Sequence, residues 1–311
     1  MAQKVSTEEF IACWNKHGSP AKVAEELGMN IRSVYNRRND LQLEGVKLLS
    51  FGAPQHTKVS SQVSENRRII EHNVENGHIF IASDCHYWPG EETVAHKAFV
   101  SLVKDFKPQT VVLNGDVFDG AQVSRYPPLM GVTTPTAKQE IEACQDRLNE
   151  IAVASKNAKK FWTFGNHDTR LFSRMASNAP ELVDMVNLFD HFPGWHTCWR
   201  IDVNKNIVIK HRWHNGIHAT YNNALKSGKT IITGHLHKLQ SVAYSDYNGR
   251  RWGVDTGTLA EPYGDQFTYT ESNPVNWCSG FAVITIENGK LLPPELCEVI
   301  GGVAYFRGKR V

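Results

Sequence analysis

The sequence predicts an α/β fold preceded by a small all-helical domain, and three observations support this fold class. Between residues 78 and 237, short apolar runs alternate with amphipathic stretches long enough to form helices. Several of these runs end in polar residues and glycine, as strands do where they enter a loop. The first 45 residues show helical periodicity instead. We therefore divide the chain into an all-α domain at 1–45, a linker at 46–66 and an α/β domain at 67–311.

Length and composition agree with this division and exclude several classes of protein. With 311 residues and 41% hydrophobic content, the chain can bury one large core and one small core. The net charge of +2 produces no strong global field, so an acidic partner must be held by local patches. Six scattered cysteines without a CxxC pair argue against a disulfide framework and against a thiolate zinc site. No apolar run approaches the roughly 20 residues that cross a bilayer, so we expect no membrane association and a cytoplasmic location.

Three short helices are expected in the first 45 residues. Ser6 and Glu9 can form a capping box at the start of an apolar-periodic helix. Pro20 suits the first position of a second helix, which stops at Gly28 because glycine adopts the positive φ of a sharp turn. A third helix is expected over residues 31–38.

The spacing of the second and third helices resembles the helix-turn-helix family. Counted from Pro20, Ala24 occupies the fifth place, Gly28 the ninth and Val34 the fifteenth. The resemblance implies that the small Ala24 lets the two helices approach and that Gly28 makes the turn. The shared core would then be closed by Leu27, Ile31 and Val34.

The third helix would present donors to phosphates and base edges, namely Arg32, Asn36, Arg37 and Arg38. We therefore predict DNA as a partner of this domain. The alternative is a three-helix interaction or oligomerisation module with a solvated basic face, so homo-oligomerisation stays open.

Five strands are expected in the first part of the larger domain, each a short apolar run. They occupy residues 78–82, 110–113, 161–163, 206–210 and 230–233. Amphipathic stretches at 91–106 and 136–157 connect the first three strands and are long enough for the crossovers that parallel strands need. Beyond residue 239 the domain continues with further short β runs.

Each of these five strands is followed by histidine, carboxylate or amide side chains. They are Asp84 and His86, Asp116, Asn166 and His167, His211, and His235 and His237. Because the carboxyl ends of adjacent strands in an open α/β sheet converge on one crevice, side chains far apart in sequence can meet there. Imidazole and carboxylate are common ligands of divalent metals, so the sequence predicts a metal site.

The order Asp-x-His, Gly-Asp-x-x-Asp, Gly-Asn-His-Asp, His and Gly-His-x-His resembles the calcineurin-like metallophosphoesterases and covers roughly residues 78–260. The resemblance implies a four-layer αββα sandwich of mixed sheets and an enzyme that hydrolyses phosphoesters with two divalent metal ions. Mixed nitrogen and oxygen ligation suits Mn, Fe, Zn or Co better than Ca, and we favour Mn.

Carried over by position, the resemblance assigns one metal to Asp84, His86 and His237, with Asp116 bridging to the other. The second metal would be held by Asn166, His235 and His211. His211 follows its strand directly, where the family has His followed by Gly. Arg212 departs from that pattern and His214 precedes Asn215-Gly216, so His214 is the alternative.

The same resemblance suggests how a phosphodiester would be hydrolysed. His167 stands where the family places a histidine near the leaving-group oxygen, so we interpret it as the general acid, oriented by Asp84. A structural histidine is the alternative. Arg125 and Arg170 are candidates for phosphate contacts, although each could equally form a surface salt bridge. Asp119 is expected to orient a metal ligand.

The substrate does not follow from the fold, because this family serves several phosphoester substrates. A helix-turn-helix tethered by a linker would raise the effective concentration of DNA at the metals. The arrangement looks most like the phage and bacterial nucleases related to the double-strand-break repair exonuclease subunit. We therefore predict a DNA nuclease that uses a metal-activated hydroxide. The alternatives are a small-nucleotide phosphodiesterase or phosphoprotein phosphatase with a docking module, and a non-enzymatic DNA-binding regulator on the same scaffold.

Overall fold

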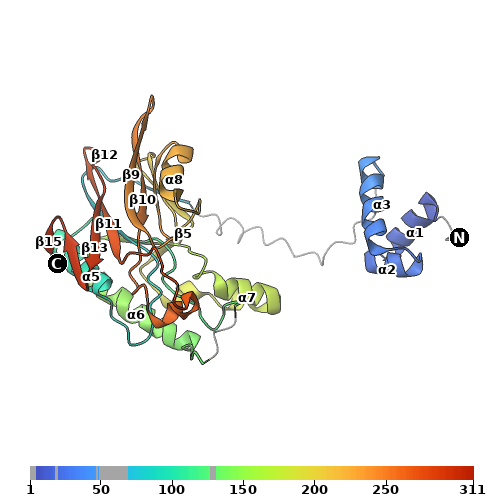
Figure 1. The fold of residues 1–311 in the computed structure, drawn as a ribbon, viewed down its shortest axis with the longest axis horizontal. Helices are drawn as coiled ribbons and strands as arrows, with labels where there is room; N and C mark the ends of the chain where they lie inside the picture. The colour runs from blue at the N-terminus through green and yellow to red at the C-terminus, as the bar shows by residue number, and fades with distance from the viewer. Residues whose placement is uncertain (1–4, 18–19, 47, 49–68, 127–130) are drawn as a thin grey trace. The chain divides into compact units, whose positions relative to one another are not determined.

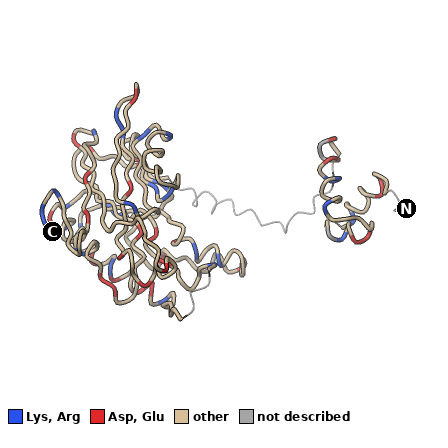
Figure 2. The backbone as a smooth tube through the Cα atoms, viewed as in Figure 1, with Lys and Arg blue, Asp and Glu red and all other residues tan. Residues whose placement is uncertain are grey.

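A computed structural model describes residues 5–17, 20–46, 48, 69–126 and 131–311 (Figure 1). The chain forms two compact units, residues 1–63 and 64–311. Apart from residues 46 and 48, the linker predicted at 46–66 lies outside the described residues. Basic and acidic residues are interspersed along both units (Figure 2), which agrees with the small net charge.

The N-terminal unit consists of three helices, α1 (Thr7–His17), α2 (Pro20–Glu26) and α3 (Ile31–Leu43). The predicted capping box opens α1, because the backbone nitrogen of Ser6 donates to Glu9 and that of Glu9 donates to the Ser6 hydroxyl. Gly28 has a φ of 60° and makes the turn between α2 and α3. The buried core comprises Phe10, Cys13, Trp14, Val23, Val34 and Leu41.

Two of the core residues predicted between α2 and α3 pack against this core, but the third does not. Val34 is fully buried and Leu27 is partly buried. Ile31 is 47% exposed, so its predicted core position was wrong. It is the first residue of α3, and the buried stripe of that helix passes through Val34 and Leu41 further along.

The larger unit is built on two mixed sheets. The first sheet has the strand order β15 (Lys309–Arg310), β14 (Val303–Phe306), β13 (Glu295–Ile300), β11 (Gly280–Glu287), β2 (Gly77–Ala82), β3 (Thr110–Leu113), β4 (Lys159–Thr163) and β5 (His196–Cys198). A further short strand, β12 (Lys290–Leu291), pairs with β11. The second has the order β1 (Ile69–His72), β6 (Arg200–Val203), β7 (Ile207–Ile209), β8 (Thr230–Thr233), β10 (Gly249–Thr256) and β9 (Leu239–Asp246). Strands β2 to β5 run parallel, as do β7, β8 and β10.

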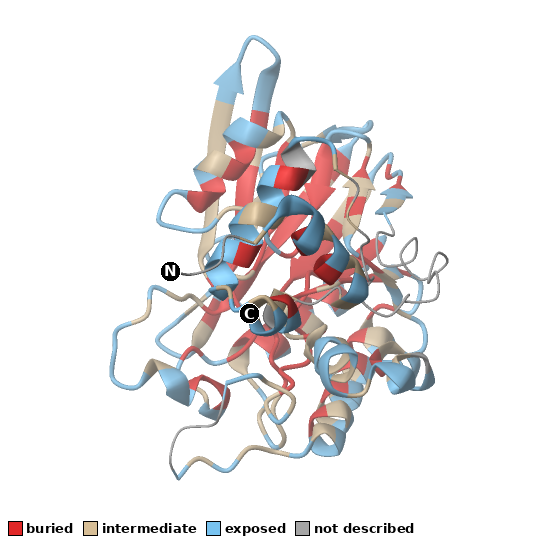
Figure 3. Ribbon diagram, turned by 90° about the vertical axis from the view of Figure 1, so that its right-hand side faces the viewer, coloured by how far each residue is buried: buried red, intermediate tan, exposed pale blue. Residues whose placement is uncertain are grey.

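The side chains of β2 alternate between two cores, as the period of a strand requires. Phe80 and Ala82 belong to the core under helices α5 (Val94–Phe106) and α6 (Ala137–Ala154). Ile79 and Ile81 belong to a second core, which also contains residues of β7, β8 and β10 and therefore lies between the two sheets. Buried residues are concentrated in the strands of the two sheets (Figure 3).

Helix α8 (Ala219–Ser227) packs on β8, β9 and β10 on the side away from the second core. The order of layers is therefore helix, sheet, sheet, helix. This arrangement confirms the predicted α/β fold of mixed sheets.

Helix boundaries follow capping residues. Thr93 caps α5 by accepting from the backbone nitrogen of His96, and Thr136 forms a capping box with Gln139 at the start of α6. After β4 the chain forms α7 (Arg170–Asn178) and then the 3-10 helices η1 (Pro180–Met185) and η2 (Leu188–His191). No helix among the described residues is long and apolar enough to cross a membrane. None of the six cysteines, all of which the structure describes, forms a disulfide, and five of them are buried.

Candidate metal centre

The loops after β2, β3, β4, β7 and β8 bring the predicted ligands together. Ligand atoms within 4.8 Å of one another define three groups that share members. The groups are Asp84, His86 and His237; His86, Asp116 and His167; and Asp116, His211 and His235. Because His86 and Asp116 each belong to two groups, the side chains form one continuous centre and not separate clusters.

Distances within the centre place Asp116 and Asp84 between the histidines. The Nε2 atom of His237 lies 3.2 Å from Oδ1 of Asp84. The Nε2 atom of His211 lies 3.1 Å from Oδ2 of Asp116 and 4.0 Å from Oδ1 of Asp84. Imidazoles that follow strands of the second sheet therefore lie close to carboxylates that follow strands of the first sheet.

The backbone at this centre is strained at the ligands themselves. Asp84, His86, Asp116, His235 and His237 have φ angles of 51°, 40°, 52°, 72° and 55°. Residues other than glycine rarely adopt a positive φ, and such strain persists only where surrounding contacts impose it. The strand ends are thus bent to aim these side chains inward.

Two glycines of the motifs are required by close approach. A Cβ atom added to Gly165 would stand 2.1 Å from Oδ1 of Asp116, and one added to Gly234 would stand 2.4 Å from the Ser83 hydroxyl. Both distances are far below van der Waals contact. Gly165 therefore makes room for Asp116.

Asp168 is the residue that joins the loops after β3 and β4. It is fully buried and accepts hydrogen bonds from the backbone nitrogens of Asp116, Gly165, Val117 and Phe118 at 2.8 to 3.2 Å. It also accepts from Nε1 of Trp162 at 3.0 Å. The sequence pattern does not reveal this connection, because the contacts cross between loops.

Asp119 orients two of the imidazoles. Its Oδ1 atom lies 2.8 Å from Nδ1 of His86 and 2.9 Å from Nδ1 of His167. Burial favours the protonated carboxyl, but hydrogen bonds from His167 and His86 hold the pKa of Asp119 below its usual range. With each Nδ1 donating to Asp119, the Nε2 atom of His86 is free to bind a metal.

The prediction that Asp84 orients His167 was wrong. Asp84 Oδ2 instead accepts from the Ser83 hydroxyl at 2.5 Å and from the backbone nitrogen of His235 at 2.8 Å. Asp84 precedes the bend after β2 and faces the other sheet, whereas the loop after β3 carries Asp119 to the imidazole of His167.

Several donor atoms in the centre are buried and make no well-aligned hydrogen bond in the described structure, although His211 and His237 lie close to carboxylates. They are Asp84 Oδ1, His86 Nε2, Asn166 Oδ1, His211 Nε2 and His237 Nδ1. Buried polar atoms are nearly always paired, because leaving one unpaired costs about 1–3 kcal/mol. All five belong to predicted ligands, so the donor set fits divalent cations.

Electrostatics support the same conclusion. Burial opposes protonation of His211, but the carboxylates of Asp116 and Asp84 raise its pKa to about 10. Burial and the charge on His211 lower the pKa of His235 to about 4. The two buried carboxylates thus demand positive charge, which a metal cation supplies.

The structure brings His211, and not His214, into the centre. His211 is 2% exposed and its ring lies 5.3 Å from that of His235. The ring of His214 stacks on Trp213 at 4.7 Å, and its backbone nitrogen donates to Asn223.

The two arginines predicted to contact phosphate lie in different surroundings. Arg170 donates to the backbone oxygen of Asp119 at 2.9 Å, and its Nη2 atom lies 3.0 Å from Nε2 of His167. Arg125 donates to the Tyr126 hydroxyl at 2.7 Å. Arg170 therefore belongs to the centre, and no contact in the described chain places Arg125 there.

Aromatic rings cover one side of the centre. Phe267, in η3 (Asp265–Thr270), lies 5.0 Å from the ring of His86 and 5.4 Å from that of His237. Trp277 lies 4.4 Å from His237. Sequence reasoning missed both rings, because the loop that carries them has no periodic pattern.

The predicted DNA-binding residues of α3 do not share one environment. Arg32 and Asn36 are exposed. Arg37 lies over the Phe10 ring at 5.3 Å, and Arg38 lies over the Trp14 ring at 5.7 Å. Arg37 and Arg38 are therefore partly committed to packing α3 against α1.

Residues 77–255 match the family described as calcineurin-like phosphoesterase, and the chain belongs to this family. It is a hydrolase that acts on phosphoester bonds. This finding confirms the resemblance seen in the motifs.

Relatives with known sequences include the Gene 54 proteins of Mycobacterium phages L5 and D29. Each is 27% identical to this chain, over 246 and 247 residues respectively, and each alignment covers 72% of this chain and 94% of the relative.

Solved structures with a similar fold include an archaeal phosphodiesterase, the E. coli phosphoesterase Yfce and a dimetal phosphatase from Danio rerio. Their identities are 16%, 18% and 10%, and their TM-scores are 0.37, 0.32 and 0.33. The matches cover 71%, 70% and 76% of this chain, and 99%, 97% and 98% of the respective structures.

Proposed function

We propose that this phosphoesterase is a dinuclear-metal-dependent DNA nuclease. DNA is proposed as the substrate because the chain has a separate three-helix unit, whose α3 exposes Arg32 and Asn36 on one face. These residues lie four apart, so their side chains point the same way along the helix. A guanidinium and an amide suit contacts with phosphates and base edges.

Two divalent metal ions would be held by the predicted ligands, with Asp116 between the two sets. One set is Asp84, His86 and His237. The other is His211 and His235, together with Asn166, whose Oδ1 is buried without a hydrogen-bond partner in the described chain. Such ions would neutralise the phosphodiester and lower the pKa of a bound water, and Mn suits this mixed donor set.

His167 would deliver a proton from Nε2 to the leaving-group oxygen. Its Nδ1 atom lies 2.9 Å from Oδ1 and 3.1 Å from the backbone oxygen of Asp119, so the proton on Nδ1 stays in place. The contact of Nε2 with Arg170 requires an unprotonated Nε2. An anionic substrate would draw the guanidinium of Arg170 to its phosphate and leave Nε2 able to carry a proton.

Cleavage assays separate this proposal from its alternatives. Labelled linear and circular DNA are incubated with the protein and Mn²⁺, alongside the small diester bis-p-nitrophenyl phosphate. We expect hydrolysis of both. Intact DNA together with hydrolysed small diester would instead indicate a small-nucleotide phosphodiesterase or phosphatase. Failure to bind metal would favour a DNA-binding regulator without catalysis.

A further inference from the structure

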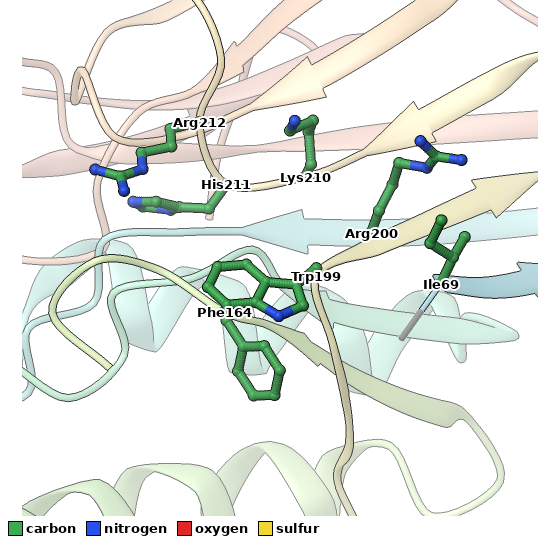
Figure 4. A pocket seen from close by; sticks show the side chains of 7 residues that line it. All are labelled: Ile69, Phe164, Trp199, Arg200, Lys210, His211 and Arg212. Atoms are coloured by element: carbon green, nitrogen blue, oxygen red, sulfur yellow. The ribbon is translucent and has the colours of Figure 1, made fainter. Parts of the chain in front are cut away.

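A hollow of about 480 Å³ opens beside the metal centre (Figure 4). Its lining includes Phe164, Trp199, Arg200, Lys210, His211 and Arg212. We call these residues the cationic aromatic pocket. His211 also belongs to the metal centre, and Phe164 directly precedes the Gly-Asn-His-Asp motif, so the pocket adjoins the reacting groups.

The pocket carries an excess of positive charge. Arg200 pairs with Asp202, with Nε and Oδ1 2.7 Å apart. No carboxylate in the described part of the chain forms an ion pair with Lys210 or Arg212. Arg200, Lys210 and Arg212 line the same hollow. Cations held close to one another without a counter-charge favour an anionic ligand.

The opposite wall of the pocket offers an exposed aromatic surface. Trp199 is 37% exposed, and its ring is fixed against Phe164 with centroids 5.1 Å apart at 75°. In Figure 4 the indole of Trp199 lies next to Phe164, while the side chain of Arg212 extends beside the imidazole of His211. An exposed indole next to Lys210 and Arg212, which have no carboxylate partner in the described chain, combines a stacking surface with phosphate donors.

These features discriminate between ligands. A phosphomonoester or a phosphopeptide would use the cations and leave the indole without a partner. In a duplex the bases are stacked on each other, so no base face is available to Trp199. An unpaired nucleotide can use both the cations and the indole, because its phosphate is charged and its base has a free π face.

We propose that the cationic aromatic pocket binds single-stranded nucleic acid next to the scissile phosphate. Lys210 and Arg212 contact a backbone phosphate, and one base stacks on Trp199. The inference rests on the proposed nuclease function and specifies its substrate class as an unpaired strand.

The test measures how strongly oligonucleotides inhibit hydrolysis of bis-p-nitrophenyl phosphate by the full chain with Mn²⁺. This readout reports binding at the centre even if no DNA is cut. The variants are Trp199→Leu, Trp199→Phe and the pair Lys210→Gln with Arg212→Gln. The matched controls are Tyr247→Leu, an exposed aromatic residue at a hairpin tip, and Lys226→Gln, an exposed cation on α8.

We expect a single-stranded oligothymidylate to inhibit the wild type more strongly than a duplex of equal length. Trp199→Leu should weaken that inhibition about tenfold or more, and Trp199→Phe should restore most of it. The double variant should weaken it by a similar factor and reduce its dependence on salt. Both controls should stay within twofold of the wild type.

Equal inhibition by single strand and duplex, or inhibition unchanged in Trp199→Leu and in the double variant, would overturn the inference. If the wild type cleaves no DNA yet is inhibited by single strands through Trp199, the nuclease proposal fails while the pocket assignment holds. If DNA is cleaved and the variants cut single strands as fast as the wild type, relative to the small diester, the pocket assignment fails alone.

Discussion

The metal centre and the outer face of α3 are built in opposite ways. At the centre, Asp84, Asp116 and His211 are at most 2% exposed, and each lies on strained or crowded backbone. On α3, Arg32 and Asn36 are exposed. Leaving a buried polar group without its partner costs far more than doing so for an exposed group, which water can satisfy.

Because of this difference in burial, the metal centre and the outer face of α3 have different roles. The buried centre fixes the reaction, because its geometry allows few substitutions. In the proposed nuclease, the exposed surfaces would select the substrate, because each contact there adds a modest, independent amount of affinity. Single substitutions at the centre should therefore abolish activity, whereas those on α3 should lower affinity in small steps.

The largest effect is expected for Asp116→Asn. The substitution keeps the shape of the side chain but removes the charge of a residue that belongs to two of the three groups at the centre. We expect kcat/KM for the small diester to fall by about 10⁴-fold or more, with loss of bound metal. Mass spectrometry of the metal content and initial rates measure both quantities. Asp105→Asn, an exposed residue of α5, is the control. Near-normal activity of Asp116→Asn would show that the centre tolerates substitution and does not depend on this carboxylate.

A smaller effect is expected for His167→Ala. As a proton donor, His167 should contribute about 10²–10⁴-fold to kcat, while the metal content stays at the wild-type level. The rate loss should be least for substrates with a good leaving group, such as p-nitrophenolate, which needs little protonation. Loss of metal from this variant would instead show that His167 is a ligand.

The strands that carry the ligands could be predicted because they are central and buried. β2, β3, β7 and β8 have burial on both faces, so they read as continuous apolar runs. β5 and β6 were not predicted, and neither was β13. Their sequences mix polar and apolar residues, since β6 alternates in burial and β13 is partly exposed.

The sequence predicted that the proposed ligands cluster and that Asp119 orients one of them, which is His86, but it did not predict their other partners. Ligands follow strand ends, which is a local pattern visible in the sequence. Asp168, Phe267 and Trp199 act through contacts between distant loops, and only the fold brings these contacts about. The same reason explains why Asp119, and not Asp84, orients His167.

A moderate effect on stability is expected at Glu140, which supports the loop after Asp119. Glu140 is fully buried and accepts from the backbone nitrogens of Gly120 at 2.6 Å and Ala121 at 3.0 Å. Burial and the charge on Asp119 raise the pKa of Glu140 from 4.5 to about 7. The folded protein therefore holds this proton more tightly than the unfolded chain does.

The resulting stability is complete below pH 4.5 and is lost as the pH rises through 7. Over that range the free energy of unfolding should fall by roughly 3 kcal/mol on account of Glu140. Glu140→Gln removes this dependence, whereas Glu142→Gln, on an exposed part of the same helix, is the control. Urea unfolding at pH 5 and pH 8 measures the difference. An equal pH dependence in Glu140→Gln and the wild type would refute the assignment.

The smallest effect is expected on α3, where the double change Arg32→Ala and Asn36→Ala should weaken DNA binding by about tenfold. The slope of log affinity against log salt should fall by about one for each phosphate that the variant no longer neutralises. Lys104→Ala, an exposed cation on α5, controls for the change in charge.

Arg37 and Arg38 are unsuitable for this test, because they pack over Phe10 and Trp14 and their truncation would also loosen the N-terminal unit. Fluorescence anisotropy with labelled DNA measures the affinity. Unchanged binding would mean that the exposed face of α3 does not read DNA, and the choice of substrate would then depend on the surfaces of the larger unit alone.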